Sequence, residues 1–238
     1  MTLRALFLQH NPESRPGLIG AELARRGFDI DLLEMAPTIH DGTWTGAYPD
    51  PLAYDLVVPL GAIWSLYDRT AVGSWIDREL DLLRRADEHR VPVLGICFGG
   101  QALAAAHGGT VEASPRPELG WTLVDSLDEA LVPPGPWMQW HTDRFTVPPG
   151  ATELARNTVG VQAFRLRRNL GVQFHPEVDE DNVASWFAMA GDEAHVFAAS
   201  VGMSVESVLE DTRANHDRAL VDVERLVGRF LTDVAGSG

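Results

Sequence analysis

Short apolar runs alternate with amphipathic segments over the first hundred residues of the chain. The apolar runs have the length of buried strands and are predicted at residues 3–8, 28–33, 55–59 and 91–96. Residues 18–26 are predicted as a helix ended by Gly27, and residues 69–90 carry apolar side chains at helical spacing. Strands and helices that alternate in this way predict a parallel, doubly wound α/β sheet.

The pattern changes after about residue 110, where short strands separated by Pro and Gly turns dominate. They are predicted at residues 122–124, 137–140, 153–156, 160–166 and 171–174. This part of the chain is expected to add a small antiparallel β portion to the sheet. Residues 204–234 are predicted as one or two helices, with packing residues Leu209, Leu220, Val223 and Leu226.

Composition and charge narrow the classes of function. The chain has 238 residues and a formal net charge of −15, which argues against nucleic acid or an anionic membrane as a partner. The single cysteine excludes an internal disulfide and a zinc cluster built on cysteines. The first residues lack the features of a signal peptide, and no apolar run has membrane-spanning length. The cytoplasm is therefore the expected compartment.

The single cysteine, Cys97, lies between the apolar run 91–96 and a helix-forming run that begins after Gly100. A Gly-x-Cys-x-Gly segment between a strand and a helix is the cysteine form of the nucleophile elbow. Flanking glycines are needed because the sharp turn leaves no room for side chains. The sulfur is expected to stand above the sheet at the positive end of a helix, which favours the nucleophilic thiolate.

A cysteine nucleophile needs a base, and the base needs a group that orients it. The tract Gln173-Phe174-His175-Pro176-Glu177 supplies both. Residues i and i+2 of an extended segment lie on the same face, so His175 and Glu177 are expected side by side. A carboxylate next to an imidazole fixes its tautomer and stabilises the imidazolium.

These motifs resemble those of the class I (triad) glutamine amidotransferases. The resemblance rests on GICFGGQ around Cys97 and on QFHPEV around His175, and it extends over roughly residues 3–190. The opening segment is similar to free-standing members akin to the amidotransferase domain of GMP synthase. The resemblance implies a flavodoxin-like α/β fold with an amidotransferase domain over residues 1–190. The C-terminal helical extension, residues 191–238, lies outside the resemblance and is expected to pack on the same domain.

The resemblance also implies a mechanism. Cys97 attacks the γ-carboxamide of glutamine, His175 moves the protons and Glu177 holds His175. Backbone N–H groups of Phe98 and of the Gly61-Ala62 loop are expected to form the oxyanion hole. Gln101 is expected to help bind the amino-acid end of glutamine. Neither a cofactor nor a metal is expected, and the acidic residues 179–181 are interpreted as the first turn of a helix.

The sequence departs from the family pattern near the expected substrate site. Ala62 and Ile63 stand where the family has Gly and Pro, Trp140 stands where a small polar residue is frequent, and Gly100 where bulkier residues are common. An altered pocket leaves three readings open. The first is glutamine hydrolysis with ammonia passed to a separate partner synthase. The others are a γ-glutamyl hydrolase or peptidase acting on a γ-glutamyl peptide or conjugate, and a catalytically silent regulatory subunit.

The chain is too short for a synthase domain and has no P-loop motif, so we expect either that a separate partner synthase takes the ammonia or that no transfer occurs. The sequence also suggests roles for three further polar residues near the site. His141 and Asp143 are expected to cap a turn near the site, and His10 is expected to have a structural role at the same sheet edge as Cys97.

Overall fold

A computed structural model describes residues 2–36, 38 and 40–236 of the chain. The strands are β1 (Leu3–Gln9), β2 (Phe28–Glu34), β3 (Leu56–Pro59), β4 (Leu94–Ile96), β5 (Val111–Thr122), β6 (Asp125–Ser126), β7 (Trp137–Phe145), β8 (Thr152–Arg156), β9 (Val161–Leu166) and β10 (Asn169–Val172). The helices are α1 (Gly17–Arg25), α2 (Arg69–Val72), α3 (Ile76–Glu88), α4 (Phe98–Ala106), α5 (Glu180–Ser200) and α6 (Val205–Arg229). A 3₁₀ turn spans Pro51–Ala53, and a π-helical turn, Phe230–Ala235, continues α6.

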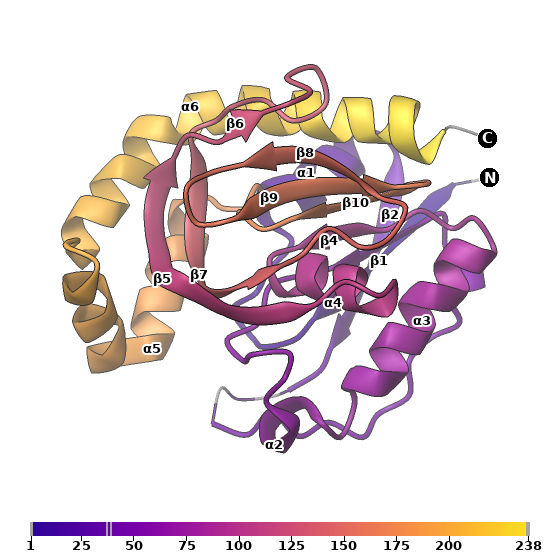
Figure 1. Cartoon of the computed structure of the whole chain (residues 1–238), viewed down its shortest axis with the longest axis horizontal. Coiled ribbons are helices and arrows are strands. Elements are labelled where there is room, and N and C mark those ends of the chain that lie inside the picture. The colour runs from indigo at the N-terminus through magenta and orange to yellow at the C-terminus, as the bar shows by residue number, and fades with distance from the viewer. Residues whose placement is uncertain (1, 37, 39, 237–238) are drawn as a thin grey trace.

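The central sheet has a parallel part and an antiparallel part (Figure 1). Strands β2, β1 and β3 are parallel neighbours, and a bridge between Val57 and Val93 joins β3 to the segment that leads into β4. β10 lies parallel to β4 on its other side, and β9, β8 and β6 follow in antiparallel register. The parallel order β2-β1-β3-β4-β10 is that of a flavodoxin-like fold, which confirms the predicted fold class.

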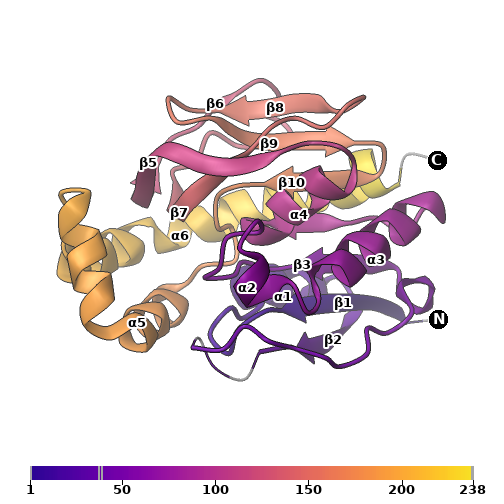
Figure 2. The same ribbon diagram turned by 60° about the horizontal axis from the view of Figure 1, so that its bottom comes forward.

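Both faces of the central parallel strands are buried, whereas the edge strand β2 is partly exposed. In β1, Ala5 and Phe7 belong to one apolar cluster and Leu6 and Leu8 to another. The continuous apolar pattern of this strand follows from that double burial. The first cluster lies under α1 and α6 and the second under α3 and α4. Figure 2 shows the sheet between these two layers.

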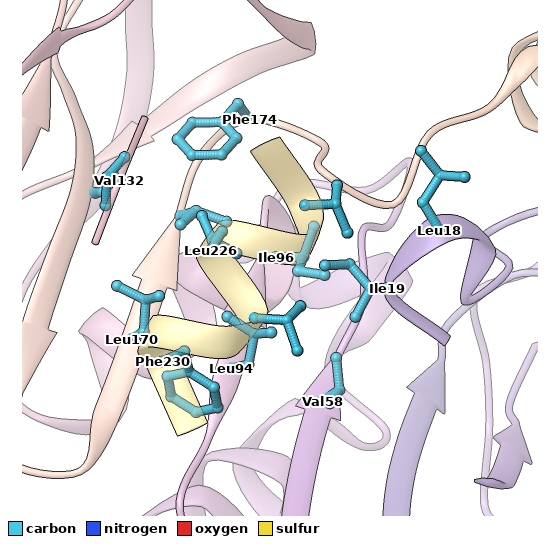
Figure 3. Close-up of a cluster of buried hydrophobic side chains, with 14 of the residues drawn as sticks. Leu18, Ile19, Val58, Leu94, Ile96, Val132, Leu170, Phe174, Leu226 and Phe230 are labelled. Carbon is cyan, nitrogen blue, oxygen red and sulfur yellow. The ribbon is translucent and has the colours of Figure 1, made fainter. Parts of the chain in front are cut away.

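The last helix is part of the main core. Leu226 and Phe230 lie beside Leu94 and Leu170 of the sheet, as Figure 3 shows. The division of the chain after residue 190 stays a prediction. α5 runs across that position with a kink at Gly191.

The strands β5 and β7 form a separate antiparallel ribbon near α5 and α6 (Figure 1). The predicted strand at 122–124 is wrong, because the strand at this place is β5 and ends at Thr122. β5 escaped prediction because it contains Ser-Pro-Arg-Pro and an irregular register between Ala113 and Glu118. Strand β7 is also longer than predicted and reaches Phe145.

Two helix predictions need correction. The single helix over 69–90 is divided into α2 and α3 at Gly73, and the buried Trp75 ring between them donates a 2.7 Å hydrogen bond to the Gly42 carbonyl. Leu220 is 45% exposed and is therefore not a packing residue, whereas Val223 and Leu226 are buried as predicted. Within the described ranges, no helix has the length and apolar character needed to cross a membrane.

Candidate active site

Cys97 occupies a strained turn between β4 and α4. Its backbone has φ 52° and ψ −108°, in the left-handed half of the map that residues other than glycine rarely adopt. A Cβ atom on Gly95 would lie 2.5 Å from the Gly99 carbonyl oxygen, and one on Gly99 would lie 2.0 Å from the Pro59 oxygen. The glycines on both sides of the cysteine are therefore required by the close approach of backbone.

The segment that carries His175 and Glu177 follows β10, the strand next to β4. Three backbone hydrogen bonds fix it: Gln173 N–H to Gln162 O at 2.9 Å, His175 N–H to Met138 O at 2.8 Å, and Leu18 N–H to Glu177 O at 2.8 Å. It is thus anchored to β9, to the ribbon and to α1. Cys97 N–H also donates to Val172 O of β10 at 2.9 Å, which joins the two halves of the site.

His175 and Glu177 form a buried pair. Nδ1 of His175 lies 2.7 Å from Oε1 of Glu177, and the two residues are 5% and 1% exposed. Burial acts to lower the pKa of His175, but Glu177 and the adjacent Cys97 side chain raise it by more. The pKa therefore stands well above its ordinary value of 6.5. The ring is suited to hold a proton next to the sulfur.

One cavity of about 450 Å³ brings the predicted site residues together. Its lining includes Cys97, His175, Gln101, Gly61, Ala62 and Phe98. Glu177 lies behind His175 and does not line the cavity. The residues predicted to act as nucleophile, base, oxyanion donors and glutamine-binding side chain thus line one cavity.

The loop at Gly61 lies close to Cys97 and His175, and the buried His10 side chain contacts its backbone. A Cβ atom on Gly61 would lie 3.0 Å from Cε1 of His175. Nδ1 of His10 lies 3.3 Å from the Gly61 carbonyl oxygen, and its Nε2 lies 3.0 Å from the carboxylate of Glu79. Both side chains are fully buried. Burial and Glu79 raise the pKa of Tyr48, whose neutral hydroxyl donates to Glu79 at 3.1 Å.

The prediction that His141 and Asp143 cap a turn is wrong, because both lie within β7. Nε2 of His141 is 3.2 Å from the Glu118 carboxylate, and the Tyr67 hydroxyl donates to Asp143 at 2.8 Å. Burial acts to raise the pKa of Glu118, but hydrogen bonds from His141 and Asn157 bring it below its ordinary value. His141 and Asp143 line the cavity from β7, and Glu118 supports His141 from the neighbouring strand β5.

Gln173 is a site residue that the sequence reasoning missed. Its Oε1 accepts from Gln101 at 3.3 Å, and its Nε2 lies 3.7 Å from the sulfur of Cys97. The signal was present in the sequence, because Gln173 precedes His175 by two residues and shares its face of the extended segment. In the part of the chain that the structure describes, no group of three or more His, Cys, Asp or Glu side chains is arranged to hold a metal ion.

Comparison with known proteins agrees with this geometry. The family model for Glutamine amidotransferase class-I matches residues 67–184. The glutamine-hydrolyzing GMP synthase of Aeropyrum pernix is 40% identical over 114 residues, which are 42% of this chain and 22% of that protein. A subunit of the glutamine-hydrolyzing GMP synthase of Saccharolobus solfataricus is 38% identical over 100 residues, 38% of this chain and 53% of that protein. The matches thus span about a fifth to a half of these relatives.

Two solved structures share the fold over nearly their whole length. A glutamine amidotransferase from Thermotoga maritima superposes with a TM-score of 0.82 at 24% identity, over 97% of this chain and 99% of that one. A glutamine amido transferase from Methylobacillus flagellatus has a TM-score of 0.82 at 24% identity, over 98% and 96% of the two chains. The chain therefore carries a class I glutamine amidotransferase domain, matched over residues 67–184, and it resembles GMP synthases in this part.

Proposed function

We propose that this chain hydrolyses the γ-carboxamide of glutamine with Cys97 as nucleophile, His175 as general acid and base, and Glu177 as the group that orients His175. The observation that carries the proposal is the buried His175–Glu177 pair, with its 2.7 Å contact, beside a cysteine on a strained elbow. A nucleophile, a base and an orienting carboxylate in this order are the parts that covalent acyl transfer needs.

The first half of the reaction forms a thioester. Cys97 gives its proton to His175, and the sulfur attacks the γ-carbonyl carbon. Backbone N–H groups of Phe98 and of the Gly61-Ala62 loop stabilise the oxyanion. His175 then protonates the amide nitrogen, the C–N bond breaks and ammonia leaves. Gln101 binds the amino-acid end of glutamine, and Gln173 holds the Gln101 amide in place.

The second half releases glutamate. Water attacks the γ-glutamyl thioester while His175 accepts a proton from it. The C–S bond breaks, the product leaves with a γ-carboxylate, and the cysteine regains its proton. The raised pKa of His175 supports the first half of the reaction, because the ring then holds a proton for the leaving nitrogen.

The fate of the ammonia is a second part of the proposal. The Saccharolobus solfataricus relative is named as one subunit of GMP synthase, so this type of domain occurs there as a separate chain. We infer that the ammonia made by this chain passes to a separate synthase subunit. The test is to measure glutamate release by the chain alone and together with proteins that co-purify with it. If no synthase co-purifies, or if the one that does fails to stimulate release, this part of the proposal is contradicted.

Glutamate and ammonia released from glutamine by the purified chain test the reaction itself. Cys97→Ala is expected to abolish both products. A chloroketone analogue of glutamine is expected to label one site per chain, because Cys97 is the only cysteine, and excess glutamine should protect it. Absence of both turnover and labelling, with and without partner proteins, would refute the proposal and favour a silent regulatory subunit.

A further inference from the structure

An aromatic wall borders one side of the active-site cavity. We use this name for Trp140 of β7 and for Trp186 and Phe197 of α5, which line the same cavity as Cys97. The Trp140 ring lies 5.8 Å from that of Trp186 and 6.3 Å from that of Phe197, and it is parallel to the latter within 4°. Trp140 and Phe197 are only half-buried, so part of their apolar surface remains open to the cavity.

The wall lies on the side of the cavity where the leaving group must depart. The ring of Trp186 contacts that of His175 at 4.9 Å between centroids, and Nε2 of His175 lies 3.4 Å from the Trp140 carbonyl oxygen. His175 delivers its proton to the amide nitrogen, so that nitrogen must come within reach of the ring. Any substituent on the nitrogen therefore lies against Trp140 and Trp186.

The kink in α5 completes the wall. Gly191 has φ 55° and ψ −135°, so the helix changes direction between Trp186 and Phe197. Beyond the kink, Phe197 comes back to stack on Trp140. Residues of both halves of α5 thus face the same cavity.

We propose that the preferred substrates are γ-glutamyl amides whose nitrogen carries a neutral apolar group of aromatic size. This inference rests on the proposed function: the same Cys97 reaction cleaves glutamine and releases ammonia, and it cleaves amides with an apolar group on the nitrogen faster and releases an amine. The amide nitrogen of glutamine carries no apolar group and would leave the wall in contact with water. A cavity of about 450 Å³ lies in the range of clefts that bury ligands larger than a single amino acid. A ring placed on the wall removes apolar surface from water on both sides.

Charge at the cavity favours an amine over an amino acid as the leaving group. The lining includes the carboxylates of Asp143 and Glu193. Among the described residues that line it, none is Arg or Lys. A γ-glutamyl peptide would bring a further carboxylate into this acidic cavity and be repelled, whereas a neutral benzyl or phenyl group would not.

The step balances without a further reactant. The sulfur of Cys97 forms a bond to the γ-carbon, His175 gives its proton to the substituted nitrogen, and the C–N bond breaks to release a neutral amine. Water then adds to the thioester carbon, the C–S bond breaks, and the proton of the water returns through His175 to the sulfur. The overall change is γ-glutamyl amide plus water to glutamate plus amine.

The experiment compares γ-glutamylmethylamide, γ-glutamylbenzylamide and γ-glutamylphenylalanine with glutamine on the full chain, with glutamate as the product measured. Both amides release a primary alkylamine, so they differ mainly in the ring. We expect kcat/KM for the benzylamide to exceed that for the methylamide by about tenfold or more, because apolar groups in a fitted pocket discriminate by that amount. The phenylalanine conjugate should be slower than the benzylamide.

Variants of the wall test its role. Phe197→Ala should lower the benzylamide-to-methylamide ratio of kcat/KM about tenfold, and Phe197→Leu, which keeps apolar volume, should lower it less. The control is Val196→Ala on the same helix, because Val196 is 71% exposed and does not line the active-site cavity. It should leave the ratio unchanged.

The outcomes separate this inference from the proposed function. If glutamine or the methylamide is cleaved as well as the benzylamide, or if the ratio does not move in a folded Phe197→Ala, the substrate class is wrong and the cysteine mechanism stands. If none of the four compounds yields glutamate, or if Cys97→Ala retains activity, the proposed function itself fails.

Discussion

Nδ1 of His175 lies 2.7 Å from Oε1 of Glu177, and the contact is buried next to Cys97. This contact leaves Nε2 as the ring atom available to the cavity, where the proposed leaving group would lie. The tautomer and the orientation of the base therefore depend on a residue that does not itself line the cavity.

Replacing that carboxylate tests this dependence. Glu177→Gln keeps the shape but lets the amide donate to the ring, which favours the wrong tautomer. We expect kcat/KM for any cleaved substrate to fall about 10²–10⁴-fold. Steady-state glutamate release measures the loss, and circular dichroism checks the fold. Activity within a few-fold of the parent chain would contradict the assigned role.

The protonation of His175 gives a second prediction. Because Glu177 and Cys97 raise the pKa of His175 above its ordinary value, the folded chain holds this proton more tightly than the unfolded chain. Protonated His175 therefore stabilises the folded state. This contribution to the free energy of unfolding is complete below about pH 6.5 and is lost as pH rises through the raised pKa of His175. In an NMR titration, the His175 midpoint should lie above that of an exposed histidine and should fall in Glu177→Gln. A His175 midpoint that is the same in Glu177→Gln as in the parent chain would show that Glu177 does not raise the pKa of His175.

The space around Gly61 gives a third prediction. A methyl group at this position would press on Cε1 of His175 at 3.0 Å, and the ring cannot yield freely because Glu177 holds it. Gly61→Ala should lower kcat/KM by up to about 10²-fold, the effect of a small displacement of a catalytic group. In the control Gly160→Ala, the added methyl meets only the Arg144 side chain, so activity should stay within about twofold. Equal effects of the two changes would contradict the prediction.

The candidate catalytic residues could be proposed from the sequence because their signals are local, and the structure brings them together at one cavity. Gly95, Cys97 and Gly99 share one turn, and His175 and Glu177 are two residues apart on one extended segment. The central parallel strands were likewise predictable, because burial on both faces makes them continuously apolar.

The helix break, strand β5 and the aromatic side of the cavity depend on contacts between residues far apart in the sequence, which no local pattern encodes. Helical periodicity continues from Val72 to Ile76, so the break at Gly73 is hidden within it. β5 is polar and contains proline because it pairs only with β7 and lies mostly near the surface. Trp186 and Phe197 both reach the cavity because α5 bends at Gly191. An isolated glycine in an apolar helix is not enough to predict a kink from the sequence.

The buried pair behind the Gly61 loop gives a fourth prediction. His10→Phe and Glu79→Leu each leave one polar partner buried without the other, and each should lower the free energy of unfolding by about 3–5 kcal/mol. The double variant should be less destabilised than the sum of the two, because neither buried group then remains unpaired. Denaturant unfolding of the four chains measures the coupling.

Activity in the same four chains separates support of the fold from support of the site. The double variant still lacks the contact from His10 to the Gly61 carbonyl oxygen, 3.3 Å in the parent chain. We therefore expect kcat/KM to remain low when stability recovers. If activity returns together with stability, His10 serves the core alone and does not position the Gly61 loop.

The kink of α5 gives the last prediction. A Cβ atom on Gly191 would meet nothing within 4 Å, so Gly191→Ala introduces only backbone strain, about 1–3 kcal/mol at φ 55°. A helix that relieves the strain by straightening carries Phe197 away from Trp140. The benzylamide-to-methylamide ratio of kcat/KM should then fall, while the melting temperature decreases modestly. Gly150→Ala is the matched control, because Gly150 also has positive φ, 80°, and open space, but lies in the turn before β8. It should lose similar stability and keep the ratio. A ratio that falls equally in both variants would show that the preference follows general stability and not the position of Phe197.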